Sequence, residues 1–599
     1  MTMRTRALLK TCLMLSLTRV SLQAQSPKPS EAEILVGANI LVSREEGDSP
    51  HAETIIAANP NEVRNLLGAS ILFTRSAWGL SCKTYASKDG GYTWVATAFP
   101  ESFEYMSFDP QVAFGIHSTA YFIMLSVGNS NVTHFYRSED NGFTWEKPRV
   151  LKKSDHPQMI VDDTTGRYAG RVYVSAMHGI NSLGVTRSEN DGRSFIGPTH
   201  IPNARNYSML NQNPLVFGDG TLFIPYFIWG QEGQVELSGT IRAEFVTSSD
   251  GGVSFSEPKR IIEVPRGKWQ PRRDLRGSFA TGSNLVYAIE TRRNIDDRLY
   301  VVWHEPRSGH QRLLFSSSVN RGKTWSVAKL VSPEVPAESS QYQPMLAVNR
   351  DGVIGIAWFD TRIAKEQDRY DLYFTASIDG GDSFLQPRRV SSRSSFPAGP
   401  GNLTPYKGYG SATTTLTDQL FRTQFERWGN GGDYMGFTAD VQGMFHPFWI
   451  DSRSGTAQVW TTGIQVVKRD GKSASIPSAP LVAVKASVND KITLVTDPPS
   501  YDAARQEAII PIRLKNISAE TIYGPLTVEV KKLAEWMILN AGNGKEGVGA
   551  VFDYSSALGD WQALRPGAFT EAVEWRFKYS GLGSTPTIGI EVKGSLAGK

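Results

Sequence analysis

SKDGGYTW begins at Ser87, and five related octapeptides follow it: SEDNGFTW from Ser138, SENDGRSF from Ser188, SSDGGVSF from Ser248, SVNRGKTW from Ser318 and SIDGGDSF from Ser377. Consecutive copies start about 50 to 70 residues apart, a spacing typical of repeat architectures. Asp or Asn at the third position can bond nearby backbone amides, and Gly at the fifth position allows a left-handed turn. The closing Trp or Phe can insert into a sheet. The octapeptide therefore predicts a hairpin turn that recurs with every repeat.

Short apolar runs surround each octapeptide. Around the second copy they are PQVAFG, TAYFIML, THFYRS and TWEKPRVL, which predict four antiparallel strands, or one blade of a β-propeller. A seventh set begins at Gly432 and offers three strands without an octapeptide. The early run at 34–43 could supply the fourth strand and close the ring, which would remove an exposed edge. We therefore predict an all-β propeller over residues 33–470 with seven blades, six being the alternative.

The octapeptide resembles the Asp box, and residues 45–470 resemble the Asp-box (BNR-repeat) β-propellers of the sialidase superfamily. The resemblance implies a glycoside hydrolase whose pocket surrounds the central axis on the face opposite the boxes. The sequence departs from the sialidases in three respects. Sialidases have six blades, their Arg-Ile-Pro signature is absent here, and no acid directly follows Arg75 in RSAWGLS. No catalytic residue of the family is therefore carried over by motif.

Two segments flank the predicted propeller. Residues 1–25 combine basic residues with a short apolar stretch, which predicts a signal peptide and a secreted or periplasmic protein; the alternative is a basic, disordered terminus. Residues 471–480 are polar and predict a linker. Residues 481–599 alternate apolar with polar residues and predict an immunoglobulin-like β-sandwich. This sandwich would serve either as a docking module for carbohydrate or a cell surface, or as a packing appendage.

The composition excludes several classes of function. The 599 residues carry 63 basic and 59 acidic side chains, and the absence of a basic block argues against a nucleic-acid partner. No apolar run reaches the roughly 20 residues of a membrane-spanning helix, so no integral membrane segment is predicted. The cysteines are Cys12 and Cys82, which exclude a Cys-based zinc site. We predict no cofactor and no metal; Asp162 and Asp163 could offer oxygens to calcium, with a solvated turn as the alternative.

Strand alternation places the links between blades and the hairpins between second and third strands on one face, opposite the octapeptides. Three of these hairpins follow a W-x-[DE]-x-R motif, at Trp303–Arg307, Trp358–Arg362 and Trp449–Arg453. Carboxylates can act as acid and base on a glycosidic oxygen, and guanidinium groups can bind a substrate carboxylate. In the alternative interpretation the acid and arginine of each motif pair with each other and brace the blade. Further polar residues precede first strands on the same face, among them His51, Glu53, Asp109, Gln212, Asn213 and Gln341.

The predicted site is drawn from that face. The predicted acid and base groups are Glu305, Asp360, Asp433 and Asp451, with Tyr342 and Tyr434 as candidates for a nucleophile of the sialidase type. The predicted substrate-binding residues are Arg75, Asp155, His156, His178, Trp229, Arg307, Arg362 and Arg453. A connection of about 48 residues from Leu385 reaches the same face and predicts a lid, with Tyr406, Tyr409, Arg427 and Trp428 as contacts; a ligand-free insertion is the alternative.

Three functions fit these patterns. The first is an exported, sialidase-like glycoside hydrolase that acts on a complex, perhaps acidic, glycan. The second is a non-catalytic propeller that binds glycans or proteins. The third is a polysaccharide lyase that acts on a uronate-containing glycan.

Overall fold

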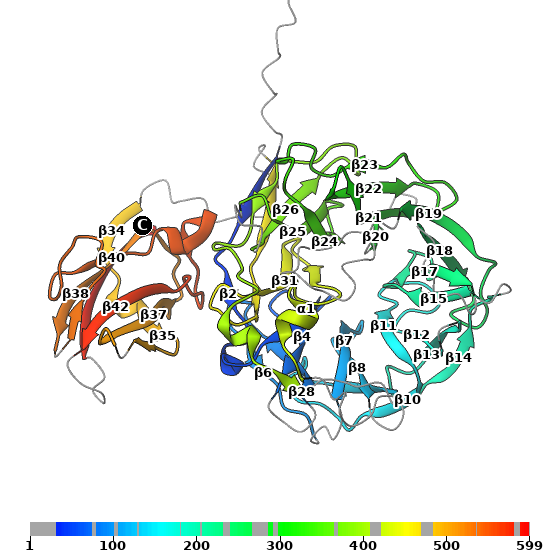
Figure 1. Ribbon diagram of the computed structural model, residues 1–599, viewed down its shortest axis with the longest axis horizontal. Coiled ribbons are helices and arrows are strands. Elements are labelled where there is room, and N and C mark those ends of the chain that lie inside the picture. The colour runs from blue at the N-terminus through cyan, green and yellow to red at the C-terminus, as the bar shows by residue number, and fades with distance from the viewer. Residues whose placement is uncertain are drawn as a thin grey trace, which may run out of the picture.

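The computed structural model describes residues 32–74, 79–100, 106–127, 131–179, 181–203, 207–231, 240–265, 285–290, 297–363, 369–407, 421–468, 483–502, 504–534, 536–579 and 587–597. Within residues 32–468 of this set, antiparallel sheets are arranged in a ring (Figure 1). We number the seven sheets of the ring 1 to 7 in the order of their first strands, starting with the sheet of β3. The predicted all-β propeller is confirmed.

Each of sheets 1 to 6 runs from an inner strand to an outer one. The inner strands are β3 (His51–Ala58), β7 (Met106–Phe114), β11 (Asp155–Val161), β15 (Tyr207–Asn211) with β16 (Leu215–Val216), β20 (Val286–Glu290) and β24 (Gln341–Val348). The second strands are β4 (Leu66–Phe73), β8 (Ala120–Val127), β12 (Val172–Met177), β17 (Leu222–Gln231), β21 (Arg298–Arg307) and β25 (Ile354–Asp360).

The third strands lead into the octapeptides, and the fourth strands follow them. The third strands are β5 (Leu80–Ser87), β9 (Val132–Ser138), β13 (Leu183–Ser188), β18 (Thr240–Ser248), β22 (His310–Ser318) and β26 (Asp371–Ser377). The fourth strands are β6 (Val95–Ala96), β10 (Arg149–Lys153), β14 (Ile196–His200), β19 (Lys259–Pro265), β23 (Lys329–Leu330) and β27 (Arg388–Arg389).

Sheet 7 is completed by the start of the described chain. It contains β30 (Gly436–Ala439), β31 (Phe445–Asp451) and β32 (Gln458–Thr461), and its outer strand is β2 (Ile40–Leu41). Ile40 pairs with Thr461 in β32. Strand β1 (Ala32–Val36) pairs along its whole length with β33 (Ile464–Lys468). The predicted pairing of the early run with the last sheet is therefore confirmed.

Each octapeptide forms the turn between a third and a fourth strand through the same hydrogen bonds. In the second copy the amide of Gly142 donates to the hydroxyl of Ser138 at 2.9 Å. The amide and hydroxyl of Thr144 donate to the two carboxylate oxygens of Asp140 at 2.8 and 2.7 Å. The fifth residue of the octapeptide has a positive φ in all six copies, for example 87° at Gly142, as the sequence predicted.

Two octapeptides carry Asn in place of Asp and keep the turn. The Asn190 side-chain oxygen still accepts the amide of Ser194 at 2.9 Å, but its side-chain nitrogen donates to the Ser194 hydroxyl at 2.8 Å. Asn320 forms the same pair of bonds with Thr324. Asp and Asn are therefore interchangeable here because the hydroxyl reverses its role.

The closing aromatic residues pack between neighbouring sheets. The ring of Trp94 lies 5.3 Å from that of Phe448 in sheet 7, and Phe384 lies 5.1 Å from Phe315 in sheet 5. Their burial joins consecutive sheets through apolar contact.

The C-terminal strands form two facing sheets of five strands. One contains β34 (Ala483–Ser487), β38 (Ile522–Leu533), β40 (Val551–Asp553), β41 (Ala563–Leu564) and β43 (Ile588–Ala597), and the other β35 (Ile492–Thr496), β36 (Ser500–Asp502), β37 (Glu507–Asn516), β39 (Trp536–Ile538) and β42 (Val573–Tyr579). They share a core in which Trp575 stacks on Phe552 at 3.8 Å. We call these two sheets the sandwich; residues 1–25 and the predicted linker lie outside the described residues.

The sandwich contacts the strands that close the ring. The 3-10 helix η5 (Ser556–Trp561) supplies Asp560, whose carboxylate accepts the amide of Val36 at 3.1 Å and pairs with Arg388 at 2.8 Å. Glu571 accepts the amide of Asn39 at 2.8 Å. The sandwich therefore braces the closure of the propeller.

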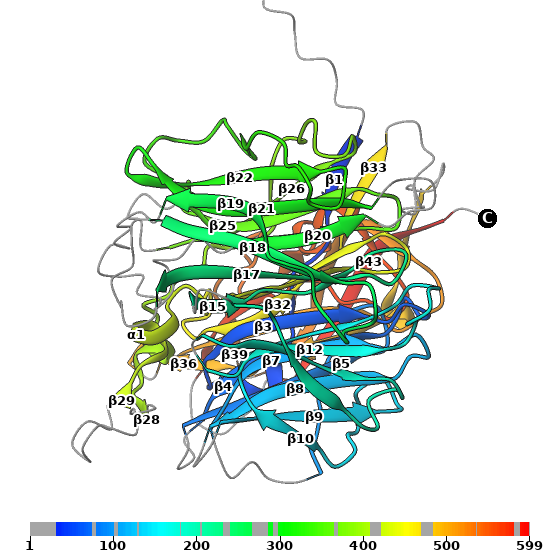
Figure 2. The ribbon, with the colours of Figure 1, turned by 90° about the vertical axis from the view of Figure 1, so that its right-hand side faces the viewer.

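Few helices occur in the described residues. They are η1 (Arg44–Glu46), η2 (Pro400–Leu403), α1 (Gln424–Trp428), η4 (Asn489–Lys491) and η5, and the hairpin of β28 (Tyr406–Lys407) and β29 (Phe421–Arg422) lies near α1 (Figure 2). In the described part of the chain, no helix is long and apolar enough to cross a membrane.

The octapeptide turn of sheet 4 yields a prediction for stability. Burial of Asp250 opposes its ionisation, but hydrogen bonds from Ser254, Ser248 and Val253 outweigh this effect and lower its pKa to about 2. Asp250→Ala should lower the free energy of unfolding by about 1 to 2 kcal/mol at pH 7. Asp250→Asn should change it by less than about 0.5 kcal/mol, because Asn occupies this position in two natural copies. Urea unfolding measures both values.

The same carboxylate should contribute to acid sensitivity. A lowered folded-state pKa stabilises the protein above the unfolded value near 3.9, and the contribution disappears as the pH falls through about 2. Between pH 5 and pH 2 the wild type should therefore lose more stability than Asp250→Asn. Equal losses would show that the carboxylate hydrogen bonds add nothing.

Candidate functional site

Four inner strands begin with the same backbone irregularity. Strands β3, β7, β11 and β24 each shift register against the second strand near their start, as at a β-bulge. The residues at these shifts have a positive φ although none is glycine: Glu53 (47°), Asp109 (50°), His156 (46°) and Gln343 (54°). Such backbone strain concentrates at functional sites, where a bulge redirects a side chain.

All four redirected side chains are polar, and they differ in exposure. Glu53 is 1% exposed, Gln343 3% and Asp109 6%. The His156 side chain is 30% exposed, so it lies closest to solvent. The links between sheets lead into the inner strands, so the four residues lie on the predicted face.

The loop before β30 crosses this group. Its Gly431 carbonyl accepts the amide of Glu53 at 2.8 Å, and its Gly432 carbonyl accepts the side-chain amide of Gln343 at 2.8 Å. Gly432 has a φ of 121°, and a Cβ atom there would lie 2.5 Å from the Cγ of Glu53. Glycine is therefore required for the close approach that brings the next residues, Asp433 and Tyr434, to the inner strands.

Electrostatic interactions connect these residues. Burial acts to lower the pKa of His156, but the carboxylates of Asp109, Asp155 and Asp433 outweigh it and raise this pKa above 6.5. Nδ1 of His156 lies 3.7 Å from Oδ1 of Asp109. We call Glu53, Asp109, Asp155, His156, Gln343, Asp433 and Tyr434 the inner-strand cluster.

Tyr434 and Cys82 lie against the same carboxylates. Burial, followed by the charges of Glu53 and Asp109, raises the pKa of Tyr434 well above 10, and its hydroxyl donates to the Pro110 carbonyl at 3.1 Å. Burial also raises the pKa of the Cys82 thiol, with smaller effects of Asp109 and Glu53. Both groups are therefore protonated at neutral pH. A tyrosine nucleophile of the sialidase type requires easier deprotonation than Tyr434 shows.

The described part of the long connection includes α1, which lies on one side of the propeller, beyond the ends of the strands (Figure 2). We take this side to be the predicted face. The side chain of Gln424 bonds the Trp428 carbonyl at 2.7 Å and the His51 carbonyl at 3.4 Å. Trp428 is 2% exposed and packs edge-on against Phe73 at 5.8 Å, so it belongs to the core. Tyr409 and the side chains of Tyr406 and Arg427 lie outside the described residues.

The three W-x-[DE]-x-R motifs form internal braces. Asp360 is completely buried; its Oδ2 accepts the indole N–H of Trp358 at 2.9 Å and an N–H of Arg362 at 2.6 Å. The Arg362 guanidinium also stacks on Tyr373 at 4.2 Å. This placement favours the bracing role, one of the two roles that the sequence left open.

The other two motifs repeat the arrangement. Asp451 accepts from Trp449 at 3.2 Å and from Arg453 at 2.6 Å. Arg453 also donates to Asn39 at 3.0 Å. This bond connects the brace to the segment of β1 and β2 that closes the ring, which we call the closing segment. Glu305 accepts from Trp303 at 3.0 Å and from Arg307 at 2.8 Å, although Arg307 is half exposed.

The remaining predicted residues are scattered. Tyr342 is 2% exposed in the core of sheets 6 and 7, and burial, followed by Tyr370 and two carboxylates, raises its pKa well above 10. His178 lies in the hairpin after β12, with its ring 5.6 Å from that of His200. Arg75 and the Trp229 side chain lie outside the described residues. Of the predicted site, the structure brings together Asp155, His156, Asp433 and Tyr434.

Sequence reasoning gave no role to Glu53, Asp109 or Gln343. A usable signal was present, because Asp109, His156 and Gln343 each precede proline at the start of a first strand. Proline removes a backbone donor there, which suits an interrupted strand pairing. Among the described residues, no group of His, Cys, Asp and Glu side chains is arranged to hold a metal ion.

Comparison with known proteins gives only distant similarity. No family model and no curated protein match the chain. The solved structures similar to it include the Hadza microbial sialidase Hz136 (14% identity, TM-score 0.35, 67% of this chain and 76% of that one). Others are the α-L-arabinofuranosidase Arb93A from Fusarium graminearum (10%, 0.36, 61% and 95%) and the intramolecular trans-sialidase from Ruminococcus gnavus (13%, 0.38, 54% and 92%). At these TM-scores the similarity carries no argument about activity.

The bracing role of Asp360 can be tested by substitution. Asp360→Asn should lower the free energy of unfolding by about 3 kcal/mol, because Arg362 is 16% exposed and loses its charged partner. Urea unfolding of the wild type and of Asp360→Asn measures this difference. An unchanged free energy of unfolding would contradict the bracing role.

The histidine of the cluster gives a second prediction. A raised folded-state pKa means that protonated His156 contributes to stability below pH 6.5, and that this contribution is lost as the pH rises through the folded-state pKa. NMR titration of 13C-labelled histidine should give a pKa above 6.5 for the resonance that His156→Gln removes. Asp109→Asn should move that pKa downwards, because the desolvation remains and one opposing charge is gone. An unchanged pKa would contradict the pairing.

Proposed function

We propose that the chain is a glycoside hydrolase whose reaction takes place at the inner-strand cluster. The observation that supports this most directly is the convergence of Asp109, Asp155 and Asp433 on His156, a side chain that is partly open to solvent. Glycoside hydrolysis requires two carboxyl groups on either side of the bond that breaks, and this cluster supplies more than two.

We assign the reacting pair to Asp109 and Asp433. Asp109 occupies a strained bulge of sheet 2, and Asp433 follows a glycine that permits the close approach of its loop, so both positions are held by special backbone geometry. Asp155 already accepts the amide of His156 at 3.0 Å and is assigned a positioning role. One carboxyl group of the pair would protonate the glycosidic oxygen as the C–O bond breaks. The other would remove a proton from the attacking water or form a glycosyl intermediate.

The charge of the cluster supports an uncharged sugar at this site. Glu53, Asp109, Asp155 and Asp433 carry four carboxyl groups, and a substrate carboxylate would be repelled by those that are ionised. Arg362 and Arg453, which would bind a sialic acid or uronate in the sialidase-like hypothesis, already pair with Asp360 and Asp451. We therefore propose a neutral glycan as substrate in preference to an acidic one.

The proposal is tested by turnover on a defined panel. The substrates are p-nitrophenyl glycosides of neutral pentoses and hexoses, neutral linear polysaccharides, a 4-methylumbelliferyl sialoside and uronate polymers. A neutral substrate should be hydrolysed. Asp109→Asn and Asp433→Asn should each lower kcat/KM by about 100-fold or more, with melting temperatures close to that of the wild type. Asp155→Asn should lower kcat/KM by less than about tenfold.

The matched control is Glu334→Gln, which removes an exposed carboxylate from the link between sheets 5 and 6 and should leave kcat/KM unchanged. Release of sialic acid would restore the sialidase-like hypothesis, and unsaturated products would favour a lyase. Full turnover in both Asp109→Asn and Asp433→Asn would remove the proposed pair. Glycan binding without turnover on any substrate would leave a non-catalytic binding propeller.

A further inference from the structure

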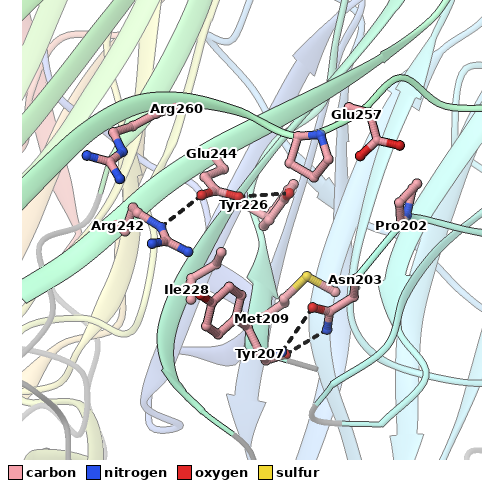
Figure 3. A pocket seen from close by; sticks show the side chains of 11 residues that line it. Pro202, Asn203, Tyr207, Met209, Tyr226, Ile228, Arg242, Glu244, Glu257 and Arg260 are labelled. Carbon is pink, nitrogen blue, oxygen red and sulfur yellow. Dashed lines mark hydrogen bonds and ion pairs between the residues drawn. The ribbon is translucent and has the colours of Figure 1, made fainter. Parts of the chain in front are cut away.

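A pocket of about 290 Å³ lies beside sheet 4, outside the inner-strand cluster (Figure 3). This volume is close to the lower limit of the roughly 300 to 1,000 Å³ found for small-molecule sites. The lining side chains come from β15, β17, β18 and β19 of sheet 4, from the hairpin between β18 and β19, and from the link that precedes the sheet: Pro202, Asn203, Tyr207, Met209, Tyr226, Ile228, Arg242, Glu244, Glu257, Pro258 and Arg260.

The pocket and the cluster share strand β15. Tyr207 and Met209 line the pocket, and Asn211, two residues further along, donates its side-chain amide to the His156 carbonyl at 2.8 Å. At about 3.3 Å per residue, Tyr207 and Asn211 are roughly 13 Å apart along the strand. The pocket is therefore a separate cavity, at a distance that a glycan chain of several units can span.

A partly buried ion pair forms one wall of the pocket. Nε of Arg242 lies 2.8 Å from Oε1 of Glu244, and the two side chains are 22% and 14% exposed. The hydroxyl of Tyr226 donates to the other oxygen of Glu244 at 3.3 Å. The Arg242 guanidinium lies 4.9 Å from the centre of the Tyr207 ring. Removing such a pair from water costs free energy, so the pair need not stabilise the fold. Its position on a cavity wall is better explained by a role in ligand binding.

The chemistry of the lining selects an uncharged, polyhydroxylated ligand. Two arginines and two glutamates face the pocket, so their formal charges cancel. Guanidinium N–H groups donate and carboxylate oxygens accept, which matches sugar hydroxyls that do both. Met209 and Ile228, which are only 1% and 7% exposed, close the base of the pocket, and the partly exposed Tyr207 ring can contact the C–H face of a sugar ring.

We propose that this pocket is a binding site for one neutral sugar unit of a glycan. This proposal rests on the proposed function, because it takes the bound sugar unit to be part of the substrate. Arg242 and Glu244 hold the hydroxyls, and the ring of Tyr207 contacts the sugar ring. Binding here would anchor a glycan chain whose scissile bond lies at the cluster.

The experiment measures binding without turnover. Isothermal titration calorimetry of the full chain carrying Asp109→Asn uses cellotetraose, xylotetraose, mannotetraose and arabinotetraose as neutral probes and sialyllactose as the charged one. At least one neutral tetrasaccharide should bind more tightly than sialyllactose. Adding Glu244→Gln should weaken its binding by about tenfold or more, because the ion pair and an acceptor are lost. Tyr207→Leu leaves the ion pair in place and should also weaken binding. It replaces Glu244→Gln in the test if Glu244→Gln does not fold.

The control is Glu334→Gln in the link between sheets 5 and 6, where the carboxylate is exposed and lies outside the lining; it should bind like its parent. Unchanged binding in both pocket variants, or no binding of any neutral tetrasaccharide, would overturn the proposal. The two proposals fail separately. Loss of turnover in Asp109→Asn with unchanged binding in Glu244→Gln would remove only the pocket, and weakened binding without turnover on any substrate would remove only the hydrolase.

Discussion

The closure of the ring is the constraint on which the rest of the structure depends. Strand β2, from the start of the described chain, adds to β32 near the end of the propeller and removes the edge that sheet 7 would otherwise expose. The closing segment is held from several sides: Arg453 donates to Asn39, Asp560 accepts from Val36, and Glu571 accepts from Asn39. The sandwich thus has a bracing role here, which accords with the interpretation of the C-terminal strands as a packing appendage.

A closed ring directs the starts of the inner strands towards one another, and the bulges exploit this arrangement. In the octapeptide turns the side chains bond the backbone amides of the same turn, and in each Trp-acid-Arg motif the acid pairs with the arginine of the same motif. The inner-strand cluster differs from them because three carboxylates act on one partly exposed histidine. Ionisable groups that interact at a partly exposed position are typical of a reaction site, whereas the acid–arginine pairs of the Trp motifs stabilise the sheets.

The fold could be predicted because its determinants are local. The octapeptide from Ser138 specifies a turn through its own side chains, and the alternation of apolar residues specifies the strands. The site was less accessible to sequence reasoning because a recurring motif such as Trp358–Arg362 signals equally a repeated brace and a ring of ligands. The hydrogen bonds from Trp358 and Arg362 to Asp360 favour the brace. Asp109 and Glu53 stand out only because their φ angles are positive. Residue type alone does not predict such a backbone conformation for Asp or Glu.

The most direct test of the account is a crystal structure of the full chain soaked with the sugar that it releases from its best neutral substrate. The account predicts density for a sugar ring within hydrogen-bonding distance of both Asp109 and Asp433, with His156 beside it. Density confined to other surfaces at saturating sugar, with the side chains of the inner-strand cluster closed over one another, would contradict it.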